Sequence, residues 1–436
     1  MRMHLKKLWL LGAALALSWT LAGCTAPSSA ESLFTLPKLP IEYTDLSRQI
    51  GELIDEGYEY ASPTSGRNIQ SVQMVDLDGD GDEEAVAFFR RSSDEKPLKI
   101  FIFRANNDTY DPLCTIESSG TGVDSVAYRD LTGDGKQELV VGWRISSDVQ
   151  AVAAYTVSAE PKLLMQSSCV RYSIEELDGD GIPSLLIFRL DDEGNSVAEF
   201  YSWHNGKMGV SYTTNLSGTM AELSRGSVVS GRLSGTKQAV FVTGVTEQNA
   251  AATDIITYRE EQGLVNLAIS QQTGSSRVVF PYMQLRPQDI NRDGMIDVPC
   301  PRSDENGQPT GVVDWIDFDE EGEDSRVLTT YHHLAGGWYF IVPEEWTDQI
   351  QVTNAEHGNY EIQTTLLVDD TQVGAIYTLT GENRENRAQR GNRIVLKRQI
   401  GTIYAAEAYA AGADFGLTED LLRQNFRLIA NQWTNG

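Results

Sequence analysis

Acidic and other oxygen-bearing residues recur at alternating positions in four nine-residue segments of the chain. The segments are 76–84, 130–138, 176–184 and 289–297, and each has glycine at its sixth position and apolar residues immediately after it. Calcium takes about six to eight oxygen ligands at about 2.3–2.6 Å, and a tightly turning loop can supply them from alternating positions. The spacing therefore predicts calcium-binding loops.

In each loop the predicted ligands are the side chains at positions one, three, five and nine and the backbone carbonyl at position seven. They are Asp76, Asp78, Asp80, Glu84 and the carbonyl of Asp82 in the first loop; Asp130, Thr132, Asp134, Glu138 and the carbonyl of Lys136 in the second; and Asp289, Asn291, Asp293, Asp297 and the carbonyl of Met295 in the last. The third loop offers Glu176, Asp178 and Asp180 but ends in Ser184. We expect three good calcium sites and a fourth, weaker one.

The alternatives to this interpretation are a helical calcium-binding motif, of the EF-hand or dockerin type, and an acidic turn without an ion. An EF-hand needs a glutamate at position twelve and a helix on each side, whereas the twelfth residue from Asp76 is Ala87, inside an apolar run. The helical dockerin type is disfavoured for the same reason. A solvated acidic turn without an ion is the other alternative, and three copies that each carry an acid at position nine favour the metal instead.

The loops recur with the period of a repeat protein. A fifth copy, 232–238, keeps the strand that follows but has lost the acids, and we interpret it as a decayed loop. The copies begin at residues 76, 130, 176, 232 and 289, in steps of 54, 46, 56 and 57 residues. The segments 99–103, 149–157, 196–203 and 254–258 are rich in β-branched and aromatic residues, which is typical of strands. The period matches four short strands, so we predict a mainly β chain, with a β-propeller of about five blades over residues 65–332.

The motif Asp76-Leu-Asp-Gly-Asp-Gly81 resembles the FG-GAP or VCBS repeats of integrin-α-like propellers, over about residues 65–330. The resemblance implies a calcium-binding propeller, although the Phe-Gly and Gly-Ala-Pro segments of that family are poorly kept here. The run Tyr60 to Phe89, with Pro63-Thr-Ser-Gly66, looks like the start of uncharacterised lipoproteins of Gram-positive gut bacteria. That second likeness implies location and architecture and no particular activity.

The first residues are typical of an export signal. Arg2, Lys6 and Lys7 precede an apolar run, 8–22, that is short for a membrane span, and Leu21-Ala-Gly-Cys24 resembles the bacterial lipobox. We predict a signal peptide over 1–23, a lipid on Cys24, a tether over 24–40 and a helical segment over 41–64, capped at Thr44 and ended at Gly57. The alternative is an ordinary signal peptide with an incidental cysteine. The lipid would hold the protein on the extracytoplasmic face of the cell membrane.

Charge and cysteine content exclude several classes. The 436 residues include 35 Lys plus Arg and 62 Asp plus Glu, a net charge of -27, which repels nucleic acid and anionic lipid head groups. Without residues 1–23 the net charge becomes -30, because that segment carries three basic residues and no acid. Besides Cys24 only Cys114, Cys169 and Cys300 remain, so disulfides do not organise this fold.

Residues 333–436 are expected to form a small α+β domain. A strand that runs into a turn is predicted over 337–346, and further strands over 360–368, 373–380 and 393–405. A helix follows, capped by Thr418 and carrying Leu422, Phe426, Ile429 and Trp433 on one face. The opening strand and Trp346 make the domain similar to PsbP-like domains. The arginines Arg384, Arg387, Arg390 and Arg393 are expected in a solvated hairpin loop, or against an acidic partner.

No catalytic motif stands out. The mature chain carries His204, His332, His333 and His357, none in a recognisable catalytic frame, and adjacent His332 and His333 would point to opposite faces of a strand. We therefore expect a binding or scaffold module with a protein or glycan partner, no nucleic acid partner, and contact with the membrane through the lipid only. A carbohydrate-active enzyme, either a polysaccharide lyase or a hydrolase, is the alternative, and a purely structural envelope component is the third hypothesis.

Overall fold

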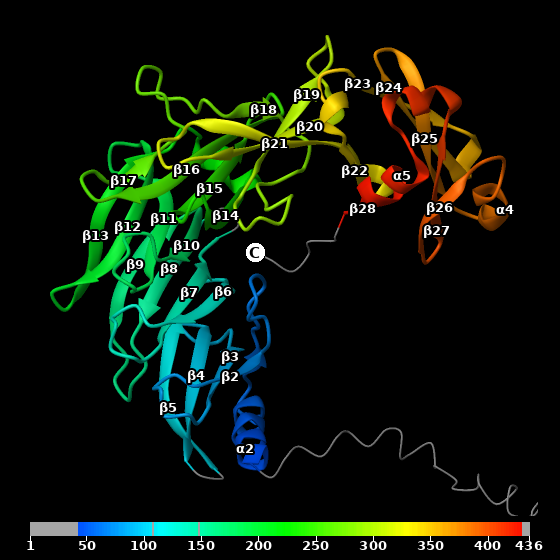
Figure 1. Ribbon diagram of the computed structural model, residues 1–436. Helices are drawn as coiled ribbons and strands as arrows, with labels where there is room; N and C mark the ends of the chain where they lie inside the picture. Colours follow the sequence, from blue (N-terminus) through cyan, green and yellow to red (C-terminus); the bar gives the residue numbers. More distant parts are fainter. Residues whose placement is uncertain (1–41, 107–108, 147–148, 430–436) are drawn as a thin grey trace, which may run out of the picture. The chain divides into compact units, whose positions relative to one another are not determined.

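The computed structural model describes residues 42–106, 109–146 and 149–429, most of them in antiparallel sheets (Figure 1). They fall into a small unit, made of residues up to Gly57 together with Ala105–Asp111, and a large unit that holds Tyr58–Arg104 and the chain from Pro112 onward. The predicted signal peptide, Cys24 and the tether lie outside the described residues.

The small unit contains helix α2 (Glu42–Asp55), which is amphipathic with Leu46 and Ile50 buried. The tip of a hairpin packs against it: the backbone N–H of Tyr110 donates to Asp45, and the ring of Tyr110 stacks on that of Tyr43. The helix begins two residues before Thr44, so Thr44 is not its N-cap. It ends ahead of Gly57, which has a left-handed φ of 91°.

The large unit holds six sheets, and every pairing between their strands is antiparallel. The first five sheets are formed by consecutive strands of the chain, except that β28 joins the fifth sheet from near the C-terminus. The first sheet has β1 (Glu59–Tyr60), β2 (Val72–Val75), β3 (Glu84–Arg90), β4 (Leu98–Asn106) and β5 (Thr109–Ser118), the last two running into the small unit; the second has β6 (Gly122–Arg129), β7 (Glu138–Arg144), β8 (Gln150–Tyr155) and β9 (Leu163–Cys169). The third has β10 (Arg171–Glu175), β11 (Ser184–Leu190), β12 (Ser196–His204) and β13 (Lys207–Asn215).

The fourth sheet has β14 (Ser227–Arg232), β15 (Gln238–Val245), β16 (Ala250–Arg259), β17 (Gly263–Asn266) and β18 (Val279–Pro281), preceded by the short helix α3 (Met220–Arg225). The fifth has β19 (Val298–Ser303), β20 (Pro309–Phe318), β21 (Asp324–His333), β22 (Trp338–Val342) and β28 (Phe426–Leu428). The predicted strands over 99–103, 149–157, 196–203 and 254–258 are confirmed in position. The structure is mainly β, and none of the described sheets closes on itself.

Consecutive sheets pack face to face, because β3, β7, β11 and β15 are apolar on both sides. In β7, Val141 joins a core with the first sheet while Val140 joins a core with the third. In β11 the same alternation places Ile187 against the second sheet and Phe188 against the fourth. Side chains alternate along a strand, so a continuous apolar run serves two cores at once. This is why the loops are each followed by five or so apolar residues.

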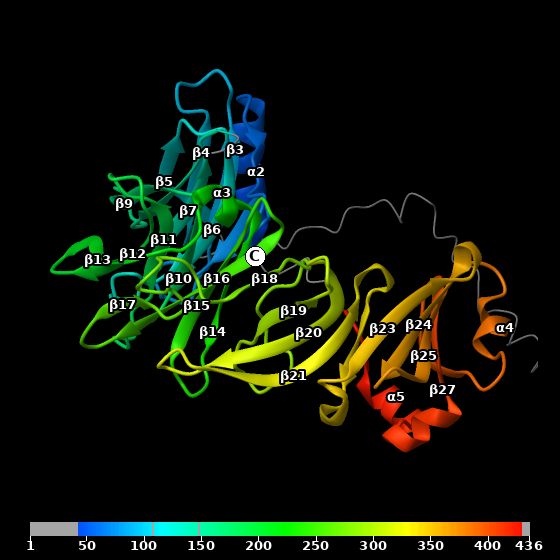
Figure 2. The ribbon, with the colours of Figure 1, turned by 90° about the horizontal axis from the view of Figure 1, so that it is seen from above.

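The last sheet is built from β23 (Ile350–Glu356), β24 (Glu361–Val368), β25 (Thr371–Leu379), β27 (Thr402–Ala408) and β26 (Ile394–Gln399), in that spatial order. We call it the C-terminal sheet. Its core is shared with the fifth sheet through Tyr331, Trp338 and Leu366, and Figure 2 shows the fifth sheet lying between the fourth and the C-terminal sheets. Four 3-10 turns, η2 (Leu334–Gly336), η3 (Glu344–Trp346), η4 (Gly358–Tyr360) and η5 (Ala410–Phe415), connect these strands.

Three expectations for this region are corrected. The closing helix α5 (Glu419–Asn425) is capped by Thr418 as predicted but ends before Phe426, which starts β28 in the fifth sheet. The single strand predicted over 393–405 is a hairpin, β26 and β27, that turns at Ile400 and Gly401. The arginine-rich segment is no solvated loop either: it contains helix α4 (Arg384–Ala388), and Arg387 and Arg393 both lie against Glu361.

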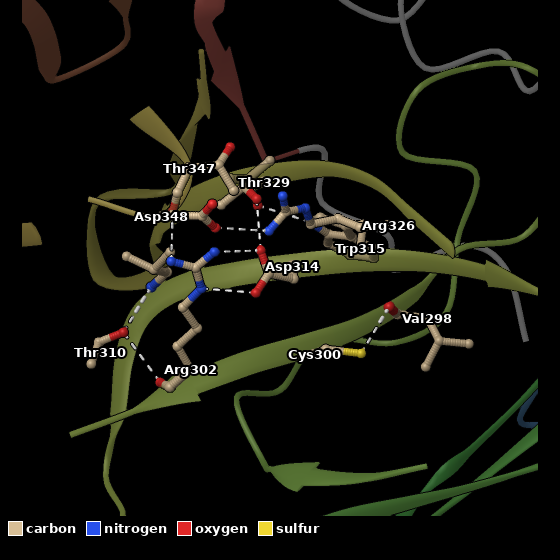
Figure 3. Close-up of polar contacts among 12 residues, drawn as sticks. Val298, Cys300, Arg302, Thr310, Asp314, Trp315, Arg326, Thr329, Thr347 and Asp348 are labelled. Carbon is tan, nitrogen blue, oxygen red and sulfur yellow. Dashed lines mark hydrogen bonds and ion pairs between the residues drawn. The ribbon is translucent and has the colours of Figure 1, made fainter. Parts of the chain in front are cut away.

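An ion-pair clamp joins the fifth sheet to the segment that follows it (Figure 3). Both oxygens of Asp314 accept hydrogen bonds from the guanidinium of Arg302 at 2.8 Å, and Thr329 donates to the same carboxylate at 2.6 Å. The remaining Arg302 nitrogen donates to the carbonyl of Thr347, 2.7 Å away. The Arg302 guanidinium and the Thr329 hydroxyl together outweigh burial, so the pKa of Asp314 is lowered.

Candidate metal centres

The first three predicted loops lie at equivalent places in the first three sheets. They connect β2 to β3, β6 to β7 and β10 to β11, so that Glu84, Glu138 and Ser184 are the opening residues of β3, β7 and β11. Asp297 comes one residue before β19. In the first three loops position nine opens a strand that is almost entirely buried, which explains why Glu84, Glu138 and Ser184 are buried; Asp297 is buried as well.

Backbone hydrogen bonds shape the first loop around its own carboxylates. Asp76 accepts from the N–H groups of Gly79 at 2.7 Å and Gly81 at 3.1 Å, and Asp80 accepts from Asp82 at 2.9 Å. At the other end Glu84 accepts from the N–H of Leu77 at 2.9 Å. The chain thus curls around positions one, five and nine.

The same pattern recurs in the second and last loops. Position one accepts from position six (Asp130 from Gly135, 2.8 Å; Asp289 from Gly294, 2.9 Å). Position five accepts from position seven, and position nine accepts from position two, in both loops; the donors are Lys136 and Leu131 in the second loop and Met295 and Ile290 in the last. Three loops with different sequences adopt one hydrogen-bonding scheme.

Each loop also contains a buried oxygen that has no hydrogen-bond partner among the described residues. At position three these are Asp78 Oδ1, Thr132 Oγ1 and Asp178 Oδ1, and at position nine it is Asp297 Oδ1. Buried polar atoms are nearly always paired, so an unpartnered acceptor that recurs at the same loop position calls for a ligand. In the last loop Asn291 Oδ1 accepts a hydrogen bond from the N–H of Asp293 at 3.0 Å, and the oxygen without a partner is instead Asp297 Oδ1 at position nine.

Burial and mutual repulsion disfavour the charged form of the position-nine acids. Burial, followed by the charges of neighbouring loop acids, raises the pKa of Glu138 to about 7 and that of Asp297 to about 7. The pKa of Glu84 is raised for the same reasons. A divalent cation at the centre of the loop would offset both effects, because it supplies the opposite charge that the loop lacks.

Among the described residues, three carboxylates come close enough together to share a cation in the first and third loops but not in the second and last. The ligand oxygens of Asp76, Asp78 and Glu84 lie within 4.8 Å of one another. So do those of Glu176, Asp178 and Asp180 in the third loop, where Ser184 replaces the acid at position nine. Carboxylate, hydroxyl and carbonyl oxygens are what calcium prefers, and these loops contain no Cys or His.

The loops of neighbouring sheets contact each other. The carbonyl of Leu77, at position two of the first loop, accepts a hydrogen bond from the N–H of Gln137, at position eight of the second, at 2.8 Å. A Cβ on Gly79 would lie 3.0 Å from the carbonyl oxygen of Gly135, so this close approach depends on glycine. In the third loop position eight is Pro183, which has no N–H to donate. The sequence carried no signal for this contact between loops.

Two hollows lie elsewhere in the large unit. One, of about 330 Å³, is lined by residues around β2, including Asn68, Gln70, Gln73 and Tyr128. The other, of about 360 Å³, lies beside the turn Leu334–Gly336 and is lined by Gln308, Thr310, Tyr331, His333 and Asn354 among others. Neither is lined by a carboxylate, so neither offers the pair of acids that most glycosidases use.

In the part of the chain that the structure describes, no group of three side chains that could hold a metal includes a histidine. The rings of His332 and His333 have separate neighbours: His332 stacks on Tyr339 and His333 on Trp338. Their separation onto opposite faces of β21 matches the alternation expected for a strand. The helices among residues 42–429 include none that is long and apolar enough to cross a membrane.

The chain matches no family model, and no curated protein matches it. Among solved structures, a hypothetical protein from Leishmania major is 12% identical, with 64% of this chain and 92% of that chain covered, at a TM-score of 0.24. An exo-β-1,3-galactanase from Phanerochaete chrysosporium, solved with galactose, is 9% identical over 77% of this chain and 81% of that chain, at a TM-score of 0.27. A variant of the same enzyme with β-1,3-galactotriose reaches 10% identity and a TM-score of 0.29, over 78% and 82% of the two chains. Scores this low do not establish a shared fold.

Proposed function

We propose that this protein is a calcium-stabilised propeller-like module that is anchored by a lipid and binds a protein or glycan at the outer face of the cell membrane. The observation that carries the calcium part is the recurrence of unpartnered buried oxygens inside loops of one hydrogen-bonding scheme. Asp76, Asp78, Asp80 and Glu84, with the equivalent residues of the second and last loops, would hold the ion. Bound calcium would neutralise the crowded carboxylates and fix the turn between two strands.

Five successive sheets whose central strands each share a core with the next are what a stack of propeller blades requires. Each sheet in such a stack buries both faces only through its neighbours, as β7 and β11 do here. The approximate fifty-residue repeat and the likeness of the Asp76–Gly81 motif to FG-GAP or VCBS repeats support the same proposal. We assign the blades to the first five sheets.

The direct test of the metal is thermal unfolding with and without calcium. Extracellular calcium modules bind with dissociation constants of about 0.1–1 mM, so each site should add about 0.4–1.4 kcal/mol at about 1 mM free ion. We expect 1 mM calcium to raise the Tm above that in EDTA, and magnesium at the same concentration to raise it less. A Tm that does not change between trace and millimolar calcium would exclude the metal.

The anchor rests on the sequence Leu21-Ala-Gly-Cys24 after an apolar run. Expressed in a Gram-positive host, the wild-type chain should partition into the membrane fraction and incorporate labelled palmitate. Cys24→Ser should appear in the soluble extracytoplasmic fraction without label. Membrane retention of the serine variant would contradict the anchor.

The binding role is tested by a pull-down from envelope extracts in calcium. Recovery of one protein or glycan, abolished by competition with the untagged chain, is the expected result. Incubation with a panel of polysaccharides tests turnover: release of reducing ends would replace the binding role with an enzymatic one. If neither assay gives a signal, a structural envelope component is the better description.

A further inference from the structure

We propose that the hollow beside the turn Leu334–Gly336 binds a neutral sugar residue of a glycan. This inference rests on the proposed binding role and gives that role a place on the molecule. The hollow measures about 360 Å³, within the range of about 300–1,000 Å³ that ligand sites occupy. It is assembled from the start of β20, the end of β21 and Asn354 of β23, so it lies where the fifth and C-terminal sheets meet.

The lining carries no charge, which sets the chemical class of the ligand. No Asp, Glu, Lys or Arg contributes to it, although the whole chain has a net charge of -27. Its two histidines are neutral at physiological pH, because burial lowers the pKa of both His332 and His333. An ionised ligand would find no counter-charge here, and desolvating it would be unfavourable. A neutral ligand would not meet this obstacle.

Several side-chain donors at the hollow have N–H or O–H groups that make no hydrogen bond to the residues that the structure describes. Nδ1 of His333 accepts from the N–H of Gly336 at 2.9 Å, so the proton of the neutral imidazole is on Nε2, which is a donor. The hydroxyl of Tyr331 accepts from Asn354 Nδ2 at 2.8 Å and keeps its own proton to donate. Asn354 Nδ2 has a second N–H, and its Oδ1 already accepts from Thr364 at 2.7 Å. Oxygen-rich ligands complement such a set.

Sugar hydroxyls can pair with both donors and acceptors of the hollow, since each hydroxyl donates one hydrogen bond and accepts others. The exposed side-chain amide of Gln308 adds a donor and an acceptor at the rim. Met283 and Leu334 add apolar surface against which the C–H face of a sugar ring can lie.

The backbone holds the ring of Tyr331 in place. Gly311 has a left-handed φ of 89°, and a Cβ at this position would lie 2.7 Å from the Tyr331 ring. Only glycine allows β20 to pass this close to the ring, so the hydroxyl is directed to Asn354 by the fold itself. A hollow whose polar groups are preset in this way binds without first reorganising.

The experiment uses the full chain in 1 mM calcium with an immobilised panel of neutral oligosaccharides, built from hexoses and N-acetylhexosamines, and an acidic polyuronate. We expect at least one neutral glycan to bind, and Gln308→Ala and Asn354→Ala each to weaken that binding by at least about tenfold, equivalent to about 1.4 kcal/mol. Gln70→Ala, in the other hollow, is the matched control and should bind as the wild type does. Because Asn354 also bonds to Tyr331 and Thr364, its variant is compared by Tm, whereas the Gln308 side chain makes no hydrogen bond within the described residues.

The outcomes separate this inference from the function on which it rests. Neutral glycan binding that survives both Gln308→Ala and Asn354→Ala would overturn the site and leave the binding role intact. Preference for the polyuronate over every neutral glycan would overturn the chemical class. Absence of any glycan binding, with a protein recovered in the pull-down, would overturn the inference alone. Loss in both variants with retention in Gln70→Ala would support it.

Discussion

At the scale of single residues, the acids at position nine of the loops are buried carboxylates. Asp297 has none of its surface exposed, one of its oxygens accepts from Ile290, and the other has no partner among the described residues. A buried carboxylate in this situation destabilises the fold unless it is protonated or meets a cation. Bound calcium should therefore offset a larger destabilisation at Asp297 than at the exposed acids of the same loop.

Asp297→Asn should remove the calcium-dependent stability of the last loop and leave the calcium-free protein as stable as before or more so. The amide keeps the shape of the side chain but carries no charge beside Asp289 and Asp293. We expect a loss of about 1 kcal/mol in 1 mM calcium and no loss in EDTA, measured by thermal unfolding. Asp191→Asn is the control, because Asp191 accepts hydrogen bonds from the N–H groups of Glu193 and Asn195 in a turn that is not one of the predicted calcium loops. A calcium response equal to that of the wild type would contradict the role of Asp297.

His332 predicts a separate dependence on pH. The ring lies between Trp315 and Tyr339, neither of its nitrogens has a hydrogen-bond partner among the described residues, and burial lowers its pKa from 6.5 to about 4. As the pH falls, His332 is protonated in the unfolded chain before it is protonated in the folded protein. The folded protein therefore has its full stability above about pH 6.5 and loses part of it between about pH 6.5 and 4. Because one pKa unit is about 1.4 kcal/mol, the loss is at most about 3.5 kcal/mol.

The measurement is denaturant unfolding from pH 7 to 4 in EDTA. His332→Phe, which keeps an aromatic ring between Trp315 and Tyr339, should show a flatter profile than the wild type. His204→Phe, at an exposed strand end, should follow the wild type. Equal slopes for the wild type and His332→Phe would show that His332 does not titrate in this way.

At the scale of elements, the clamp of Arg302 and Asp314 shows how the fifth sheet is tied to the chain that follows. Both side chains are partly buried, at 28% and 22% exposed, and Arg302 also reaches the carbonyl of Thr347. Arg302→Ala leaves Asp314 without its counter-charge, so we expect a loss of about 2–3 kcal/mol in the free energy of unfolding.

The neighbouring pair of Arg326 and Asp348 is a natural comparison, because these side chains are 44% and 83% exposed. Exposed ion pairs contribute about 0–1 kcal/mol, so Arg326→Ala should be nearly neutral in urea unfolding. Similar losses for the two arginine variants would mean that the clamp acts through charge at the surface and not through its buried hydrogen bonds.

The first two loops should be energetically coupled, because the backbone of Leu77 makes hydrogen bonds to residues of both loops. Its N–H donates to Glu84, and its carbonyl accepts from Gln137, the residue before Glu138. In a double-mutant cycle in 1 mM calcium, Glu84→Gln and Glu138→Gln should show an interaction of at least about 0.5 kcal/mol in unfolding free energy. Glu84→Gln with Asp297→Asn, from a loop that does not contact the first, should be additive. Additivity in both cycles would exclude the coupling.

The sequence predicted these elements to different extents. The strands after each loop were correct, because a run such as 85–89 is apolar on both sides and can only be buried. The closing helix was predicted too long, since Phe426 fits a helical face as well as it fits β28, and tertiary pairing with Phe340 decided the outcome. Helix α3 was missed although its capping box, Thr219 with Glu222, stands in the sequence.

The contacts that join distant segments were beyond sequence reasoning. Arg393 was assigned to a solvated loop because its charge argues for solvent, and only the fold brings Glu361 and the face of Tyr377 to it. The residues of the hollow come from four separate stretches of chain, which include Met283, Gln308 and Asn354. No local pattern links them.

At the scale of the whole molecule, the five repeated sheets provide their own control for calcium. Four sheets have a loop with acids, while the fourth sheet has Leu233-Ser-Gly-Thr-Lys-Gln238 in the same place between β14 and β15. The sheets share cores with their neighbours, so a general change in stability would reach all of them alike, whereas an ion bound in a loop would act first on that loop.

Hydrogen exchange measured by mass spectrometry, in 1 mM calcium and in EDTA, should therefore resolve a pattern along the chain. We expect calcium to slow exchange at 76–84, 130–138 and 289–297, where backbone N–H groups donate to the loop carboxylates and become fixed when an ion is bound. The effect should be smaller at 176–184, where Ser184 replaces the acid, and absent at 232–238. Equal protection of 232–238, or protection spread evenly over all five sheets, would mean that calcium acts through the net negative charge of the molecule and not through the loops.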